Sequence, residues 1–172
     1  MDSNASIDIL HRRLEPEEAR QIHIELKETP NILGYTAPEL LRLKDVHVAM
    51  VGGRFAGATW SRDMAFGWTE IAVVFVVEEF RGRGVGPRLF EAAWARAEGR
   101  NRSVYMLSRN AQVVEWMRSK GMTIDRRFCS APLAVHIHDP LYMASWYRNA
   151  EALRKWKSIR QCPPLVQGTL RR

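Results

Sequence analysis

The feature that most restricts the fold of this chain lies between Thr69 and Gly99. A run of strand-forming residues, Thr69–Val77, is followed by Arg81-Gly82-Arg83-Gly84-Val85-Gly86 and then by a helical pattern that ends near Gly99. SVYML (103–107) predicts a short buried strand after it. Because a strand–helix–strand unit is right-handed and its strands are parallel, we expect an α/β or mixed α+β sheet.

The flanking segments add strands and helices to this unit. VHVAMV (46–51), Gly52-Gly53 and RFAGATW (54–60) predict a hairpin whose second strand is antiparallel to Thr69–Val77. The other expected elements are a weak strand at Ile7–Leu10, a helix beginning at Pro16, a capped helix from Thr36 to Leu43, a helix over Asn110–Lys120 closed by Gly121, strands at 122–128 and 131–138, and a helix after Pro140. Packing residues expected in that last helix are Leu141, Trp146, Leu153 and Trp156, and the tail after Gln161 is expected to be irregular.

Length and composition predict one domain. A chain of 172 residues is enough for a single core, so we expect residues 1–147 to form the domain and residues 148–172 a basic extension packed on it. No run approaches the ~20 apolar residues of a membrane span. The first residues do not resemble a signal peptide, and Cys129 and Cys162 fit neither a disulfide framework nor a zinc site. We therefore expect a cytoplasmic protein.

The positive charge is concentrated in the last segment. The formal charge is +7, and residues 148–172 hold seven basic residues against one acid, a net charge of +6. A basic tail attracts nucleic acid, anionic lipid or an acidic protein, whereas the alternative is a solvated helix face. Both interpretations stay open, as does a homodimer.

The glycine-rich turn is the candidate ligand site. Because Pro87 follows its last glycine, it lacks the Gly-Lys-Ser/Thr ending of a Walker A loop, and it also lacks the third glycine of a dinucleotide fingerprint. What remains, Arg81-x-x-Gly84-x-Gly86 between a strand and a helix, resembles the acetyl-CoA-binding motif of the GNAT family of N-acetyltransferases. A helix N-terminus offers unpaired N–H groups, and glycines let the backbone approach a diphosphate. Arg81 and Arg83 add positive charge.

The resemblance extends from about Val46 to Phe128 and implies the GNAT fold. This is a mixed, mostly antiparallel sheet with a splayed parallel strand pair and helices on both faces, here with an extra C-terminal helix. It also implies acetyl-CoA as cosubstrate, without a metal. The coenzyme contacts that the resemblance implies are the backbone of Phe75, Val76 and Val77 for the pantetheine arm, Arg81, Gly82, Arg83, Gly84, Val85 and Gly86 for the phosphates, and Asn110. The alternative for Asn110 is an ordinary residue at a helix start.

Two positions bear on catalysis. Glu70, eleven residues before Arg81, matches the glutamate base of the histone acetyltransferase branch of the family. An amine with a pKa near 10.4 is neutral in roughly one molecule in a few thousand at pH 7, so a base that removes its proton helps. The alternative is that Glu70 is a surface residue at the start of its strand. The tyrosine that many members use to protonate the leaving thiolate falls at Met117, so this help is expected from water or Tyr142, or is dispensable.

The expected function is transfer of an acetyl group from acetyl-CoA to a primary amine by direct attack. The alternative is a GNAT-fold module that binds acyl-CoA as a sensor or scaffold without turnover. The acceptor, a small-molecule or peptide amine, is expected to bind residues 17–44 and 132–156, which match no known pattern. His136 and His138 are expected on one face of a strand. We expect them to be substrate contacts or surface and packing residues. A metal site is not expected, because it needs a third ligand.

Overall fold

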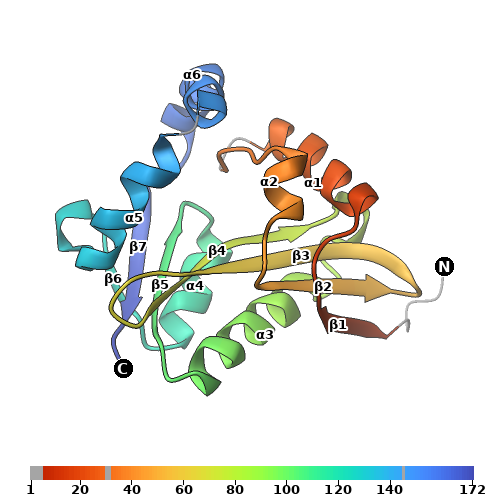
Figure 1. Cartoon of the computed structure of the whole chain (residues 1–172), viewed down its shortest axis with the longest axis horizontal. Coiled ribbons are helices and arrows are strands. Elements are labelled where there is room, and N and C mark those ends of the chain that lie inside the picture. Colours follow the sequence, from red (N-terminus) through yellow and green to blue (C-terminus); the bar gives the residue numbers. More distant parts are fainter. Residues whose placement is uncertain (1–5, 30–31, 145) are drawn as a thin grey trace.

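The computed structural model describes residues 6–29, 32–144 and 146–172, and Figure 1 shows the arrangement of its elements. The strands are β1 (Ile7–His11), β2 (Val46–Val51), β3 (Arg54–Asp63), β4 (Trp68–Val76), β5 (Ser103–Ser108), β6 (Thr123–Asp125) and β7 (Val166–Leu170). The helices are α1 (Pro16–Glu28), α2 (Ala37–Leu41), α3 (Val85–Gly99), α4 (Ala111–Ser119), α5 (Leu133–Met143) and α6 (Trp146–Gln161), with short 3-10 turns at Glu78–Phe80 and Phe128–Ser130.

One sheet of seven strands runs through the molecule in the order β1-β2-β3-β4-β5-β7-β6. Strands β1 to β4 are antiparallel neighbours, and β4 and β5 form the parallel pair that the strand–helix–strand unit predicts. The mixed α+β fold is therefore confirmed. Parallel pairing joins only Trp68–Glu70 to Ser103–Tyr105, so the two strands separate beyond that point.

Helices cover both faces of the sheet, with α1 and α2 on one side of β2–β4 and α3 on the other (Figure 1). Ile22 and Leu26 lie one turn apart on α1 and pack in the main core with Val48 and Trp60. The buried face of α3 includes Leu89 and packs against β2, β3 and β4. The two helical layers therefore hold the central strands from both sides.

Helix starts follow the capping signals in the sequence. Thr36 Oγ1 accepts from the Glu39 N–H at 3.3 Å, and the Glu39 carboxylate accepts from the Thr36 N–H at 2.8 Å, as a capping box requires. Pro16 is the first residue of α1, as predicted. The end of α3 differs, because Gly99 stays within the helix and Asn101 takes the positive φ, at 51°.

The chain beyond residue 125 departs most from prediction. Residues 131–138 lie largely in α5 and not in a strand, and Pro140 lies inside that helix instead of beginning a new one. A short apolar segment of this kind is compatible with either a strand or a helix. Here the helix is stabilised because Ala134 and Val135 pack in one buried cluster with Tyr105. The predicted strand 122–128 is reduced to β6.

The tail that was expected to be irregular forms β7. Its residues pair with β5 on one side and β6 on the other, so they lie inside the sheet. Pro163-Pro164 end the helical run, and the strand begins at Val166, two residues later. The predicted division between residues 147 and 148 falls within α6.

Helix α6 turns charged side chains toward the protein. The charged residues with exposed fractions of 7%, 4% and 4% are Arg148, Glu151 and Lys155. Leu153 and Trp156 are 79% and 57% exposed, so the prediction that they pack in the core is wrong. The side chains of Leu141 and Trp146 lie outside the described part of the chain.

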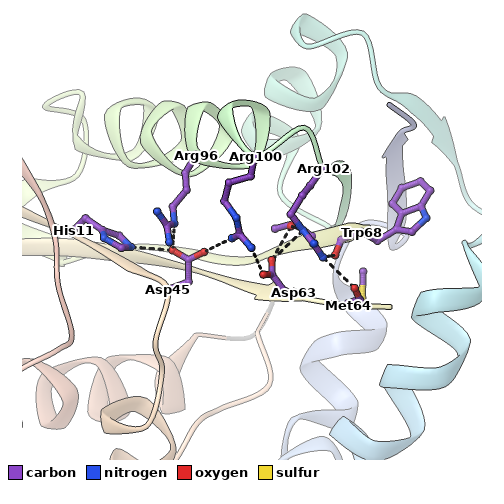
Figure 2. Close-up of polar contacts among 9 residues, drawn as sticks. His11, Asp45, Asp63, Met64, Trp68, Arg96, Arg100 and Arg102 are labelled. Atoms are coloured by element: carbon purple, nitrogen blue, oxygen red, sulfur yellow. Dashed lines mark hydrogen bonds and ion pairs between the residues drawn. The ribbon is translucent and has the colours of Figure 1, made fainter. Parts of the chain in front are cut away.

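A series of ion pairs ties the end of α3 to the sheet (Figure 2). Asp45 accepts from Arg96 Nε at 2.5 Å and from Arg100 Nη1 at 3.4 Å, and Arg100 also pairs with Asp63. Asp63 in turn pairs with Arg102, whose guanidinium donates to two backbone carbonyls at the β3–β4 turn. Two carboxylates thereby fix three arginines along one side of the sheet.

His47 on β2 is buried beside these charges. It is 7% exposed, and its ring centroid lies 4.9 Å from that of His11. Burial, followed by the charges of His11 and Arg96, lowers the pKa of His47 to about 4, against the opposing effect of Asp45. The imidazole is therefore neutral in the folded protein at pH 7.

We predict that the protein loses stability as the pH falls from 6.5 to 4. The unfolded chain protonates His47 near its ordinary pKa, whereas the folded chain resists protonation down to about 4. The free energy of unfolding should fall by up to roughly 3 kcal/mol across this window. Urea unfolding of a His47→Leu variant at about pH 7 and about pH 4.5 should show a much smaller loss. Equal losses in the two proteins would contradict this assignment.

Candidate functional site

The candidate site lies where β4 and β5 separate. Two cavities meet there, an outer groove of about 1080 Å³ and an inner pocket of about 390 Å³. The outer groove lies between the end of α1, the glycine-rich turn and the start of α4, and the inner pocket lies between β4, β5 and α6. Thr29, Ile32, Val74, Asn110 and Val113 line both, so the two form one continuous cleft.

One wall of the cleft is the edge of β4 beyond Glu70. The Val77 N–H donates to the Ala56 carbonyl at 3.0 Å, and successive residues of an antiparallel ladder alternate in direction. Val74 and Val76 therefore turn their N–H and C=O groups away from β3, toward the gap beside β5. The Val77 amide is engaged by β3. The register with β3 shifts near Ala72, which places a bulge in this edge.

The glycine-rich turn closes the outer end of the groove. Gly82 and Gly84 have φ angles of 77° and 83°, which a side chain disfavours, and Gly84 directly precedes α3. A Cβ atom on Gly86 would lie 3.2 Å from Trp116. The first bond of the helix runs from the Arg88 N–H to the Gly84 carbonyl, so the preceding N–H groups have no helical partner. With the helix dipole, these groups suit an anion.

The two arginines of the turn lie in different places. Arg81 Nε donates to the Val76 carbonyl at 3.2 Å, and its Nη2 lies 3.7 Å from Glu25 Oε2. The Arg83 guanidinium lies over the Phe80 ring, 5.6 Å from its centroid. Arg81 therefore lines the groove, and Arg83 lies on its outer side.

Asn110 is the N-cap of α4. Its Oδ1 accepts from the Gln112 N–H at 2.9 Å, and its own N–H donates to Ser108 Oγ at 3.1 Å. It also lines both cavities. Asn110 is thus a helix cap that lines the cleft, and its contact with a coenzyme stays a prediction.

Glu70 lies in the inner pocket and is 8% exposed. Arg62 Nε donates to its Oε2 at 2.8 Å, and Arg62 Nη2 donates to the same oxygen. The two residues face each other in the β3–β4 ladder. Arg62 was missed from the sequence because β3 extends to Asp63, three residues past its predicted end. Opposite charges on facing strands were the available signal.

Met117 fills the core and does not face the cleft. Its exposed fraction is 0%, and a Cβ atom on Gly168 would lie 2.9 Å from its Sδ. This close approach explains why β7 has a glycine at its centre. The side chain of Tyr142, the predicted alternative proton donor, lies outside the described residues.

The two histidines of α5 do not share a face. His136 and His138 are two positions apart on a helix, which separates them by about 200°. Within the described ranges, no group of three or more His, Cys, Asp or Glu residues is arranged to hold a metal ion. None of the helices in these ranges combines the length and the apolar character needed to cross a membrane.

Lys155 of α6 holds the segment that lines both cavities. Its Nζ donates to the carbonyls of Leu26, Thr29 and Ile32 at 2.6, 2.9 and 2.9 Å, and it lies 3.4 Å from Glu151. Burial lowers the pKa of Lys155, and the Glu151 carboxylate opposes that change. The carboxyl end of α1 thus receives a cation, although the Leu26 carbonyl also accepts from the Thr29 N–H.

Other basic residues of the last segment also bind within the molecule. Arg148 lies 2.9 Å from Glu39, and Arg154 lies 2.8 Å from Glu151. Part of the positive charge is therefore already paired. Binding of nucleic acid or an acidic partner by this segment stays a prediction.

Comparisons with known proteins agree with this geometry. A sequence model described as the acetyltransferase (GNAT) family matches residues 8–122, and no curated protein matches the chain significantly. Ard1 from Thermoplasma volcanium is 23% identical, with a TM-score of 0.57 over 69% of this chain and 84% of that chain. N-acetylglutamate synthase from Neisseria gonorrhoeae, complexed with coenzyme A and N-acetyl-glutamate, is 17% identical, with a TM-score of 0.66 over 98% of this chain but only 36% of that chain. Rv2747 from Mycobacterium tuberculosis, in a complex that contains CoA, is 14% identical, with a TM-score of 0.64 over 91% of this chain and 97% of that chain.

We predict that Lys155→Met lowers the free energy of unfolding by about 3 kcal/mol, because it removes the cation from three carbonyls and leaves the buried Glu151 carboxylate with Arg154 alone. Lys157→Met, an exposed position on the same helix, should change it by less than about 0.5 kcal/mol. Urea unfolding of both variants measures the difference. Equal stability of the two variants would contradict the role of Lys155.

Proposed function

The chain belongs to the acetyltransferase (GNAT) family, and from that premise we propose that it transfers an acetyl group from acetyl-CoA to a primary amine by direct attack in a ternary complex. One observation carries the proposal. The open edge of β4 runs from a glycine-built helix N-terminus to a buried carboxylate, through a single continuous cleft. The outer groove suits a long anionic donor, and the inner pocket suits a smaller acceptor.

In this proposal the diphosphate binds the N–H groups between Gly82 and Gly86 and the guanidinium of Arg81. The pantetheine arm pairs with the outward-facing groups of Val76 and Val74, as an added strand does. Contacts to Phe75, Val77, Arg83 and Asn110 stay predictions. The coenzyme groups thus follow one another along β4 in the order phosphates, arm and thioester.

The length of the arm bears on where the thioester lies. The five residue-to-residue steps of extended strand from Val76 back to Ile71 span roughly 16 Å. A fully extended arm therefore brings the thioester toward the bulge near Ala72 and not beside Val76. We assign the amide that polarises the thioester carbonyl to the Ile71–Val73 segment.

Glu70 is the proposed general base. It lies at the start of the open edge of β4, next to the segment that would hold the thioester. The Arg62 guanidinium fixes its carboxylate in place through two hydrogen bonds to Oε2. The amine, once neutral, attacks the thioester carbon, and the C–S bond breaks to release coenzyme A as a thiolate. The nitrogen loses its second proton, which passes through water to the thiolate and leaves the amide and the free thiol. Alignment of the two substrates supplies most of the acceleration.

We propose a small-molecule amine as the acceptor, in preference to a protein lysine. The inner pocket, at about 390 Å³, is in the lower part of the range of small-ligand cavities. Tyr35, Trp156 and Leu165 line it, so the α1–α2 loop and the C-terminal segment both contribute to its walls. The synthase that resembles this chain holds an N-acetylated amino acid together with coenzyme A, which supports an acceptor of that size.

A second candidate is a module that binds acyl-CoA without turnover. The buried Met117, at the position of the usual proton donor, favours it. Acetyl-CoA binding without thiol release over a wide panel of amines would support this alternative.

We predict that the folded protein binds acetyl-CoA with heat measurable by calorimetry, and that it releases free thiol when an acceptor amine is added. The release is followed with a thiol reagent over a panel of small amines and lysine peptides. A folded sample that gives no heat with acetyl-CoA would contradict the proposed function. Higher release with peptides than with small amines would contradict the proposed acceptor class.

We predict that Glu70→Gln lowers kcat about 10²- to 10³-fold near neutral pH, because the amide cannot take the proton of the amine. The Kd of acetyl-CoA should stay within about twofold, since Glu70 lies outside the phosphate site. Glu91→Gln, an exposed change on α3, is the control and should leave both values unchanged. An unchanged kcat in Glu70→Gln would remove Glu70 from the mechanism.

A further inference from the structure

Arg81 occupies part of the groove that a bound coenzyme would use. Its Nε donates to the Val76 carbonyl at 3.2 Å. That carbonyl faces the gap beside β5, where an N–H of the pantetheine arm would bond to it. The guanidinium therefore lies in the path of the arm and not over the N–H groups at the start of α3.

Glu25 on α1 is the second contact of Arg81. Its Oε2 lies 3.7 Å from Arg81 Nη2, which is too long for a hydrogen bond, and this oxygen has no hydrogen-bond partner among the described residues. The other oxygen, Oε1, accepts from Gln21 Nε2 at 3.1 Å, one turn earlier on α1. Gln21 thus fixes the Glu25 carboxylate with one oxygen directed at Arg81.

The strength of this contact is modest. The Arg81 side chain is 55% exposed although that of Glu25 is only 22% exposed, and the 3.7 Å separation is too long for a hydrogen bond, so the pair contributes little. The phosphates of a coenzyme offer more charge and a geometry that matches a guanidinium fork. Arg81 would therefore exchange a weak partner for a stronger one when phosphates reach the turn.

We propose that Glu25 is a positioning residue that holds Arg81 against β4 in the unliganded protein, and that the coenzyme diphosphate moves Arg81 away from Glu25 and Val76. The proposal rests on the proposed function, since it takes coenzyme A as the ligand. The movement opens the β4 edge only after the phosphates have bound. The nucleotide half of the coenzyme therefore binds first, and the arm pairs with β4 second.

The test compares two carboxylates that line the same groove. Glu25→Gln should lower the Kd of CoA, and that of its nucleotide half (3′-phosphoadenosine 5′-diphosphate), by about two- to fivefold, because Arg81 is easier to move. Glu28→Gln makes the same change of charge on the same helix and should have a smaller effect. Calorimetry measures both.

A second variant tests Arg81 itself, with pantetheine as a probe that has the arm but no phosphates. Arg81→Met should weaken CoA binding about tenfold, because a phosphate partner is lost, but it should strengthen pantetheine binding, because the Val76 carbonyl is open. If Arg81 were only structural, Arg81→Met would weaken the binding of both CoA and pantetheine. In the Arg81→Met background, Glu25→Gln should have no further effect.

The outcomes separate this inference from the proposed function. If the wild-type protein does not bind CoA, both fail. If CoA binds, three results would each overturn the role of Glu25 and Arg81 alone: equal effects of Glu25→Gln and Glu28→Gln, an effect of Glu25→Gln that persists in Arg81→Met, or pantetheine binding that Arg81→Met does not improve.

Discussion

The separation of β4 from β5 after Glu70 and Tyr105 is the constraint on which the cleft depends. Parallel strands bond when they lie about 4.8 Å apart, and beyond that distance each retains backbone groups without a strand partner. Such groups are costly where water is excluded, so a ligand that carries its own amides is a natural partner for them. The wall of the cleft is therefore main chain, and its side chains are mostly valines that pack the core. The residue types that distinguish this cleft lie at its two ends: Gly82, Gly84 and Gly86 at the outer end and the Glu70 carboxylate at the inner end.

The parts of the fold that were predicted from the sequence have local signals. The capping box at Thr36, the glycines that precede α3 and follow α4, and the two-glycine hairpin each depend on residues within a few positions of one another. The glycine-rich end of the cleft, where we propose that phosphates bind, belongs to this class, since one continuous motif builds it. The Arg62–Glu70 pair, α5 and β7 depend on partners far away in the chain. Their local patterns fit more than one structure, so packing alone decides them.

Helix α6 shows why periodicity gave the wrong buried face. Its apolar side chains Leu153 and Trp156 point outward, and its charged stripe points inward. The inward residues Lys155 and Arg148 bind a backbone carbonyl at the end of α1 and the carboxylate of Glu39 on α2. A hydrophobicity pattern assigns such a stripe to solvent. The backbone carbonyls that bind Lys155 cannot be recognised from this pattern, because every residue has a backbone carbonyl.

The position of β7 has a consequence for how the protein is made. Its residues 166–170 follow all the other described strands along the chain, yet they lie between β5 and β6, and Leu170 pairs with Val104. Until they arrive, one edge of β5 stays open, with buried-type side chains on both sides. Open edges of this kind recruit strands from other unfinished chains. The topology therefore leaves this edge of β5 exposed to such pairing until β7 has been synthesised.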